Sequence, residues 1–190
     1  MKYLIVGLGN PGSEYEGTRH NVGFRIIDQL AAELGAAFSL DRAAHVAHAK
    51  HKGRTLILIK PITFMNLSGK ALHYWMQKEQ ITLENVLVLT DDLSLSFGKL
   101  RMKGSGSDGG HNGLKDIQNC LGSTQYARLR FGIGSDFSKG IQSDYVLGKW
   151  EKEDELALPE RLLSATKMGL SFCTIGLALT MTEWNGKIDP

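Results

Sequence analysis

Short, continuous apolar runs along the chain are interspersed with longer segments in which apolar residues recur every three or four positions. Tyr3–Val6 and Val86–Thr90 are runs of the first kind, typical of central strands that are covered on both faces. His45–Lys50 and Thr55–Lys60 flank a polar turn that contains a glycine. These two segments therefore predict an antiparallel hairpin.

Two further segments, Lys99–Lys103 and Arg128–Ile133, alternate basic and apolar residues, which predicts strands with one solvated face. Helical periodicity fills much of the chain between the strands and after them. It covers Val22–Leu34, Ser68–Gln77, His111–Leu121 and a long run from Lys152 to Thr182. This alternation predicts one α/β domain over residues 1–190, a three-layer α/β/α sandwich with helices on both faces of a mixed, largely parallel, twisted central sheet.

Composition agrees with a self-sufficient globular domain. The chain has 190 residues, of which 42% are hydrophobic and 22% charged, enough to bury a substantial core. Cys120 and Cys173 are too few for a disulfide framework, and the N-terminus lacks the apolar run of a signal peptide. The apolar stretch Leu170–Met181 is well short of the ~20 residues that span a bilayer. We therefore expect a cytoplasmic protein without membrane segments.

The charge is small in total but unevenly distributed. The net charge is +2; residues 1–149 hold 18 Lys and Arg against 13 Asp and Glu (+5), whereas residues 150–190 hold 4 against 7 (−3). A basic body of this kind suggests a polyanionic partner, although a modest excess is also common on ordinary solvated surfaces.

Several familiar catalytic motifs can be excluded. Gly7–Gly12 satisfies G-x-G-x-x-G after a strand, but polar residues continue to His20 before helical periodicity begins, which argues against a dinucleotide site. There is no G-x-S-x-G elbow and no P-loop. His45, His48 and His51 have no carboxylate or thiolate nearby in sequence to complete a metal site. We expect neither a metal nor a cofactor.

The chemistry that remains is acid/base work. His20 lies in a polar loop between the first strand and the first helix, and a histidine there can exchange protons near neutral pH. Asn10, Asn66 and Asp91 all follow predicted strands, whose carboxyl ends converge in open α/β sheets. A carboxylate that holds one imidazole nitrogen leaves the other free to accept a proton. Separately, Asp91 could be a turn former, and Asn66 and Asn112 could be helix caps.

The same residues give the chain a close resemblance to the bacterial-type peptidyl-tRNA hydrolase family. The resemblance covers essentially the whole chain, and its specificity lies in the order of the motifs rather than in any one of them. The motifs are Gly7–Gly12, Tyr15 with Thr18–Asp28, Lys60–Pro61 with Phe64–Gly69, Gly109–Lys115, Arg128–Arg130 with Gly132–Gly134, and Asp144–Gly148.

The resemblance implies a monomeric, cofactor-free esterase that cuts the bond between a peptide and the 3′-terminal ribose of tRNA, without an obligate protein partner. It makes His20 the catalytic base and Asp91 its orienting partner. It also implies a mobile lid formed by Gly134–Gly140 and the helix after it. Substrate binding is implied for Asn10, Tyr15, Phe64, Asn66 and Asn112, a cleft-shaping role for Met65 and His111, and contact with the tRNA backbone for Arg101, Lys103 and Arg130.

Two positions depart from the family pattern. Thr90 stands where the family often has a histidine, and Ser94 where it often has a second aspartate. Because Asp91 is retained, we expect activity to survive. The sequence does not show which groups form the hydrogen bonds that support Asp91. The alternative function is a non-catalytic RNA-binding or RNA-processing protein on the same fold, which loss of the His/Asp/Asn set or a large exposed apolar patch would indicate.

Overall fold

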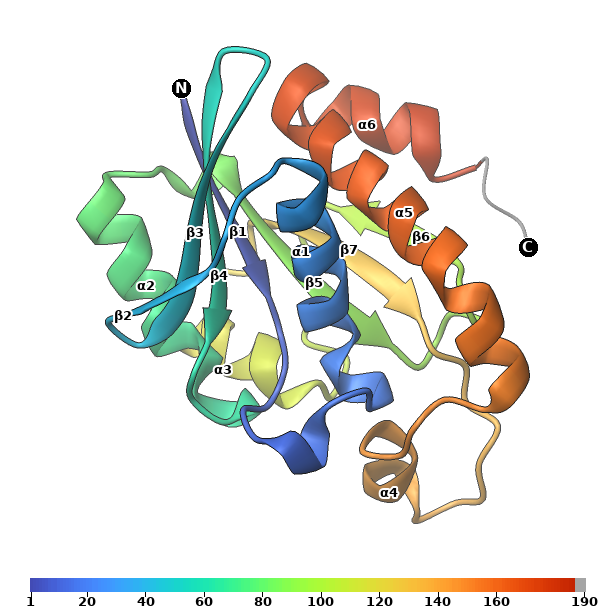
Figure 1. Ribbon diagram of the computed structural model, residues 1–190. Helices are drawn as coiled ribbons and strands as arrows, with labels where there is room; N and C mark the ends of the chain where they lie inside the picture. Colours follow the sequence, from blue (N-terminus) through green and yellow to red (C-terminus); the bar gives the residue numbers. More distant parts are fainter. Residues whose placement is uncertain (187–190) are drawn as a thin grey trace.

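A computed structural model describes residues 1–186 and contains one seven-stranded sheet. The strand order is β2-β3-β4-β1-β5-β7-β6 (Figure 1). Strand β1 is parallel to β4 and β5, and β5 is parallel to β7, whereas the other pairs are antiparallel. The strands are β1 (Lys2–Gly7), β2 (Ser39–Asp41), β3 (Ala44–His51), β4 (Arg54–Pro61), β5 (Val86–Asp92), β6 (Leu100–Lys103) and β7 (Ala127–Gly132).

Helices cover both faces of this sheet, which confirms the predicted three-layer α/β/α architecture. Helices α1 and α5 pack together on one face, where α6 adjoins α5, and α2 packs with α3 on the other (Figure 1). The α-helices are α1 (Val22–Glu33), α2 (Ser68–Glu79), α3 (Asn112–Leu121), α4 (Gln142–Val146), α5 (Lys152–Ile175) and α6 (Leu177–Trp184). The 3₁₀ turns are η1 (Ser13–Tyr15), η2 (Arg19–Asn21), η3 (Met65–Leu67) and η4 (Leu83–Asn85).

Alternation along the central strands divides the apolar core into two layers. In β5, Leu87 belongs to the cluster that contains Ile26 of α1, whereas Val88 belongs to the cluster that contains Trp75 of α2. Successive side chains of a strand point to opposite faces, so a continuous apolar run such as β5 serves both layers. This explains why β1 and β5 read as uninterrupted apolar segments in the sequence.

Close packing fixes the segment that carries His20. Gly23 lies at the start of α1, and a Cβ atom added there would lie 2.5 Å from the carbonyl oxygens of both Leu8 and Leu89. Only a residue without a side chain lets the helix approach the ends of β1 and β5 so closely. The η2 turn immediately before α1 is thereby held over the carboxyl ends of these strands.

The structure corrects several details of the predicted elements. The run from Lys152 to Thr182 is two helices, because the chain breaks at Gly176, which has φ 83° and ψ 172°. Arg128 is buried rather than solvated, because its guanidinium lies over the Tyr126 ring and donates to the carbonyls of Ser107 and Thr124. Asp91 and Asp92 are the last residues of β5 rather than the first beyond it. The short edge strand β2 was not predicted, and the last four residues of the predicted 1–190 domain lie outside the described part.

A side-chain amide occupies the open edge of the sheet at β6. Asn185, just after α6, accepts a hydrogen bond from the Met102 backbone N–H at 2.8 Å and donates to the Met102 carbonyl at 2.9 Å. The amide therefore makes the two contacts that a further strand would make. Among residues 1–186, no helix is both long enough and apolar enough to span a membrane.

Candidate active site

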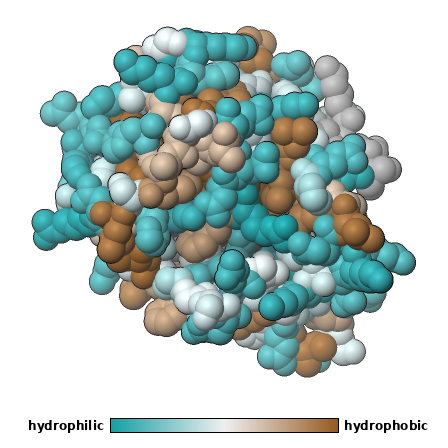
Figure 2. Space-filling view, viewed as in Figure 1, coloured by the Kyte–Doolittle hydropathy of each residue, from teal (hydrophilic) through white to brown (hydrophobic). Residues whose placement is uncertain are grey.

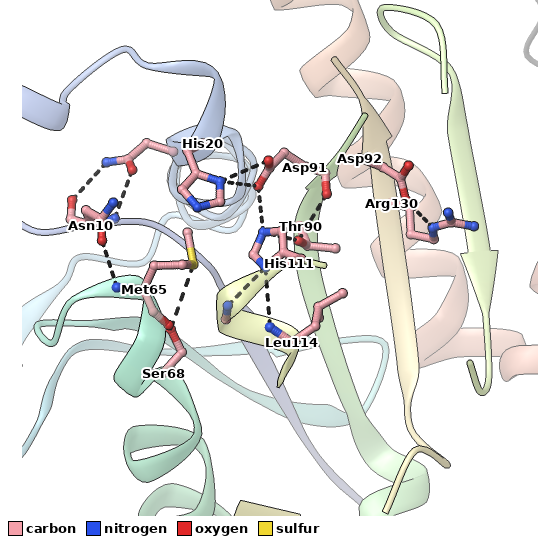
Figure 3. Close-up of polar contacts among 12 residues, drawn as sticks. Asn10, His20, Met65, Ser68, Thr90, Asp91, Asp92, His111, Leu114 and Arg130 are labelled. Atoms are coloured by element: carbon pink, nitrogen blue, oxygen red, sulfur yellow. Dashed lines mark hydrogen bonds and ion pairs between the residues drawn. The ribbon is translucent and has the colours of Figure 1, made fainter. Parts of the chain in front are cut away.

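His20 and Asp91 are 71 positions apart in the sequence, yet their side chains are hydrogen-bonded. Nδ1 of His20, in η2, lies 3.0 Å and 2.9 Å from the two carboxylate oxygens of Asp91, at the end of β5 (Figure 3). Because a carboxylate only accepts hydrogen bonds, Nδ1 carries a proton and donates it. Nε2 of His20 has no hydrogen-bond partner within residues 1–186 and remains able to accept a proton.

A second histidine reaches the same carboxylate but is held differently. Nε2 of His111 lies 2.9 Å from Oδ1 of Asp91 and 3.0 Å from Oγ1 of Thr90. Its Nδ1 accepts hydrogen bonds from the backbone N–H groups of Gly113 and Leu114, at 3.1 Å and 3.3 Å. Backbone N–H groups only donate, so Nδ1 is unprotonated and the ring proton is on Nε2. Both nitrogens of His111 are therefore occupied, in contrast to His20.

Burial and the two imidazoles together set the ionisation of the pair. Burial lowers the pKa of His20, but the charge of Asp91 and the hydrogen bond to it outweigh this effect, so the pKa of His20 lies above its ordinary value of 6.5. Burial likewise raises the pKa of Asp91, but His20 and then His111 outweigh it and hold that pKa well below its usual range. Asp91 is therefore ionised at neutral pH and anchors both rings.

Asn10 is fixed from three directions in the loop after β1. Its backbone N–H donates to Oδ1 of Asn21 at 2.8 Å, and its carbonyl accepts from Nδ2 of Asn21 at 2.9 Å. Its side-chain oxygen accepts from the Met65 backbone N–H at 2.7 Å (Figure 3). The Met65 bond fixes the orientation of the Asn10 amide, so the group that faces a ligand is Nδ2, a donor.

Asn112 is the first residue of α3 and is exposed, whereas His111 caps the helix through its ring nitrogen. The side chain of Asn112 is therefore not the helix cap, which resolves the alternative left open by the sequence. Within residues 1–186, neither its side chain nor its backbone N–H has a hydrogen-bond partner. N–H groups at a helix N-terminus suit a developing negative charge.

These side chains line one cleft of about 960 Å³ at the carboxyl ends of the central strands. Helix α4 and the residues on either side of it also line this cleft, through residues that include Phe137, Val146 and Leu147. Most of the predicted site residues are brought together here. The cleft is lined by Asn10, His20, Met65, Asn66, Asp91, Lys103, His111, Asn112 and Arg130.

Three predicted site residues lie outside the lining of this cleft. Tyr15 and Phe64 pack edge to face with ring centroids 6.3 Å apart, and Phe64 is 55% exposed. Arg101 is exposed on β6, in register with Arg130 of β7. Phe64 is exposed and Tyr15 half-buried, and Arg101 and Lys103 are exposed on β6, so a large substrate can reach both surfaces.

The two departures from the family pattern have separate structural roles. Oγ1 of Thr90 contacts Nε2 of His111 and so lies in the network around Asp91. Ser94 instead donates hydrogen bonds to Asp92: its backbone N–H and hydroxyl lie 2.7 Å and 2.5 Å from Oδ1 of that carboxylate. Arg130 pairs with Asp92 through Nε and donates to the Ser94 hydroxyl at 3.1 Å. Ser94 thus supports Arg130, whereas Thr90 supports the Asp91 network.

The ligand atoms of His20, Asp91 and His111 lie within 4.8 Å of one another, a set that a divalent metal can use. The same atoms already satisfy one another by hydrogen bonds, so a metal would have to displace both ring protons. Absence of a metal stays a prediction.

Sequence reasoning missed the direct bond between His111 and Asp91 and the two hydrogen bonds that join the Asn21 side chain to the Asn10 backbone. It also missed Arg19, which precedes His20 and is buried. The composition of these segments gave no signal for such contacts, because each joins residues that only the fold brings together.

Comparison with known proteins agrees with the geometry. Residues 4–190 match the protein family described as peptidyl-tRNA hydrolase. A peptidyl-tRNA hydrolase of Cytophaga hutchinsonii is 57% identical over 98% of this chain and all of its own length, and one of Parabacteroides distasonis is 54% identical over the same shares. The crystal structure of peptidyl-tRNA hydrolase from Acinetobacter baumannii superposes with a TM-score of 0.90 at 35% identity, covering 96% of this chain and 94% of that one. This chain belongs to the peptidyl-tRNA hydrolase family.

Proposed function

We propose that His20 is the general base of this peptidyl-tRNA hydrolase. Its Nε2 takes a proton from a water molecule, whose oxygen attacks the carbonyl carbon of the ester between the peptide and the 3′-terminal ribose. The proton then passes to the ribose oxygen as the ester bond breaks. The observation that carries the proposal is the contrast between the rings: Nε2 of His20 has no partner among residues 1–186, whereas both nitrogens of His111 are hydrogen-bonded.

Asn112 is our candidate for stabilising the oxyanion. Attack on the ester places negative charge on the former carbonyl oxygen, and donors aimed at that position lower the barrier. The side-chain amide and the backbone N–H of Asn112 stand at the positive end of α3, in the same cleft as His20. Asn66, which is exposed on η3, supplies a further neutral group for the substrate end.

The direct test of the function is release of N-acetyl-aminoacyl groups from tRNA by the purified chain, with unblocked aminoacyl-tRNA as the control substrate. We expect rapid release from the blocked substrate and little from the unblocked one. Failure to release the blocked group at any pH between 5 and 9 would contradict the proposed reaction.

Asn10 provides a physical reason for that preference. Its Nδ2–H, which has no partner within the described part of the chain, can donate to a carbonyl oxygen of a peptide, but it cannot accept from the ammonium group of an unblocked aminoacyl ester. In Asn10→Asp, one carboxylate oxygen can still accept from Met65 while the other favours an ammonium group. We expect the ratio of kcat/KM for blocked over unblocked substrate to fall by at least about tenfold, the scale of a charge-assisted hydrogen bond. An unchanged ratio would exclude Asn10 from this discrimination.

Binding of the tRNA backbone is assigned to Arg101, Lys103 and Arg130. Arg101 and Lys103 are exposed on β6, and Lys103 and Arg130 line the cleft. We expect Kd for tRNA to rise steeply with salt, and Arg101→Gln to reduce the log-log slope by about 0.7 to 0.9 if it loses one phosphate contact. Equal slopes for wild type and variant would remove Arg101 from the interface. Tyr15 and Phe64 offer rings for the terminal bases of the tRNA.

The same proposal includes one cytoplasmic domain over residues 1–190 that acts as a monomer without an obligate protein partner. Both apolar layers share one sheet, and Cys120 and Cys173 are free thiols, in keeping with a reducing compartment. On the face drawn in Figure 2, apolar residues form separate patches between hydrophilic ones rather than one broad surface. These features and the complete His/Asp/Asn set favour the enzyme over the non-catalytic RNA-binding alternative.

A further inference from the structure

Arg19 immediately precedes His20, and its side chain and backbone contact Tyr145 and Gly148, at the end of α4 and just after it. Its guanidinium carbon lies 4.2 Å from the centroid of the Tyr145 ring, and Nη1 donates to the Tyr145 carbonyl at 3.2 Å. Its backbone N–H donates to the carbonyl of Gly148 at 3.0 Å. One residue of η2 thus makes three contacts with the end of α4 and the turn after it.

Ion pairing does not account for the burial of this cation. Arg19 is 5% exposed, and its nearest carboxylate, that of Glu151, lies 3.6 Å from Nη2 on a side chain that is 84% exposed. Its Nε has no hydrogen-bond partner among the described residues. A buried guanidinium is costly without compensation, and here the closest compensation is the face and the carbonyl of Tyr145. The contacts with Tyr145 therefore account for the burial of Arg19.

The segment that Arg19 contacts forms part of the cleft wall. Val146 and Leu147, next to Tyr145 in the chain, line the same cleft as His20. The Tyr145 hydroxyl donates to the Ile133 carbonyl at 2.7 Å, just beyond β7, so Tyr145 is anchored to the sheet side as well. Gly148 also packs closely against Arg19: a Cβ atom added at Gly148 would lie 3.0 Å from Nη1 of Arg19, so a side chain there would crowd the guanidinium.

We propose that Arg19 is a positioning residue that fixes α4 against the η2 turn, so that the wall of the cleft and the catalytic base are set as one unit. The proposal rests on the role of His20 proposed above. It adds that displacement of α4 disturbs His20 through Arg19, although Arg19 itself touches neither the water nor the ester.

The test combines local hydrogen exchange with steady-state kinetics on Arg19→Gln, Tyr145→Leu and the double variant. Arg25→Gln is the matched control, because Arg25 lies on α1 and pairs with Glu155 at the surface, 2.9 Å away. We expect the amides of residues 142–148 to exchange about tenfold faster in Arg19→Gln, the scale of a partly buried cation–π contact. We also expect kcat/KM for peptidyl-tRNA to fall about tenfold, with a decrease in kcat, and Arg25→Gln to match wild type in both measurements.

Non-additivity is the decisive feature. Since Arg19 and Tyr145 act through one contact, the double variant should be no worse than the poorer single variant. Multiplying effects, or unchanged exchange over 142–148 in Arg19→Gln, would overturn the proposal, as would faster exchange with unchanged kcat. Faster amide exchange throughout the chain in Arg19→Gln would indicate a general loss of stability. In that case Tyr145→Leu, at a half-buried site, tests the proposal by the same exchange and kinetic measurements. Exchange is measured without substrate, so its result stands whether or not His20 is the base.

Discussion

Replacing His20 with asparagine should reduce kcat for peptidyl-tRNA by about 10²–10⁴-fold, the usual contribution of a general base. Asparagine retains a polar group that can donate to Asp91, so the fold should persist, but it cannot accept a proton from water near neutral pH. The wild-type pH–rate profile should rise through the pKa of His20, which Asp91 holds above 6.5, and this acid limb should vanish in the variant. Steady-state rates between pH 5 and 9 measure both effects.

His111→Asn is the matched control for this substitution. Asparagine is a good helix N-cap, so it can replace Nδ1 of His111 as the acceptor for the N–H groups at the start of α3. The variant loses mainly the contact with Asp91, and we expect a loss of about tenfold with the acid limb retained. If His111→Asn abolished the acid limb and His20→Asn preserved it, the assignment of the base would be reversed.

Asp91→Asn should be nearly as damaging, with a decrease in kcat of about 10²-fold or more. If the introduced amide presents its NH₂ group to His20, Nδ1 of that ring must become the acceptor, which moves the proton to Nε2 and leaves no base in the cleft. Loss of the negative charge also removes the interaction that raises the pKa of His20. Any residual acid limb should therefore lie at lower pH than in wild type, and a shift to higher pH would contradict the proposed pair.

The same pair should leave a signature in stability. The pKa of Asp91 is lowered in the folded chain, so its contribution is present above the unfolded value of 3.8 and is lost as pH falls below it toward the folded pKa. The pKa of His20 is raised, so its contribution is complete below the unfolded value of 6.5 and is lost as pH rises through the folded pKa. The difference in unfolding free energy between wild type and Asp91→Asn, measured in urea from pH 3 to 9, should therefore shrink as pH falls below 3.8 and as pH rises through the folded pKa of His20.

The sequence pattern predicted a strand or helix correctly where burial follows one regular pattern along the whole segment. The apolar runs of β1 and β5 and the periodicity of α1 each reflect uniform burial, so their positions followed from the sequence. The solvated face predicted for Arg128 was wrong, because alternation does not reveal that the loop carbonyl of Ser107 and the Tyr126 ring cover this side chain. The break at Gly176 was also missed, because apolar residues continue on both sides of it.

Prediction of the site was correct about proximity and incomplete about contacts. Parallel strands place their carboxyl ends at one edge, which was enough to expect Asp91 near Asn10 and Asn66. The bond from His111 to Asp91 and the contact between Arg19 and Tyr145 span 20 and 126 positions, respectively. Neither follows from periodicity or spacing, because both depend on how α3 and α4 pack in the folded chain.

Because the chain is synthesised from its N-terminus, the edge of β6 is made well before Asn185, whose amide pairs with it in the folded chain. Synthesis proceeds from the N-terminus, so the strands of the sheet are complete before α6 and Asn185 leave the ribosome. During that interval the Met102 backbone groups are unpaired, and an unpaired edge can recruit a strand from another chain. Asn185 pairs with these groups only once α6 has docked, so docking of this helix protects the β6 edge from pairing with another chain.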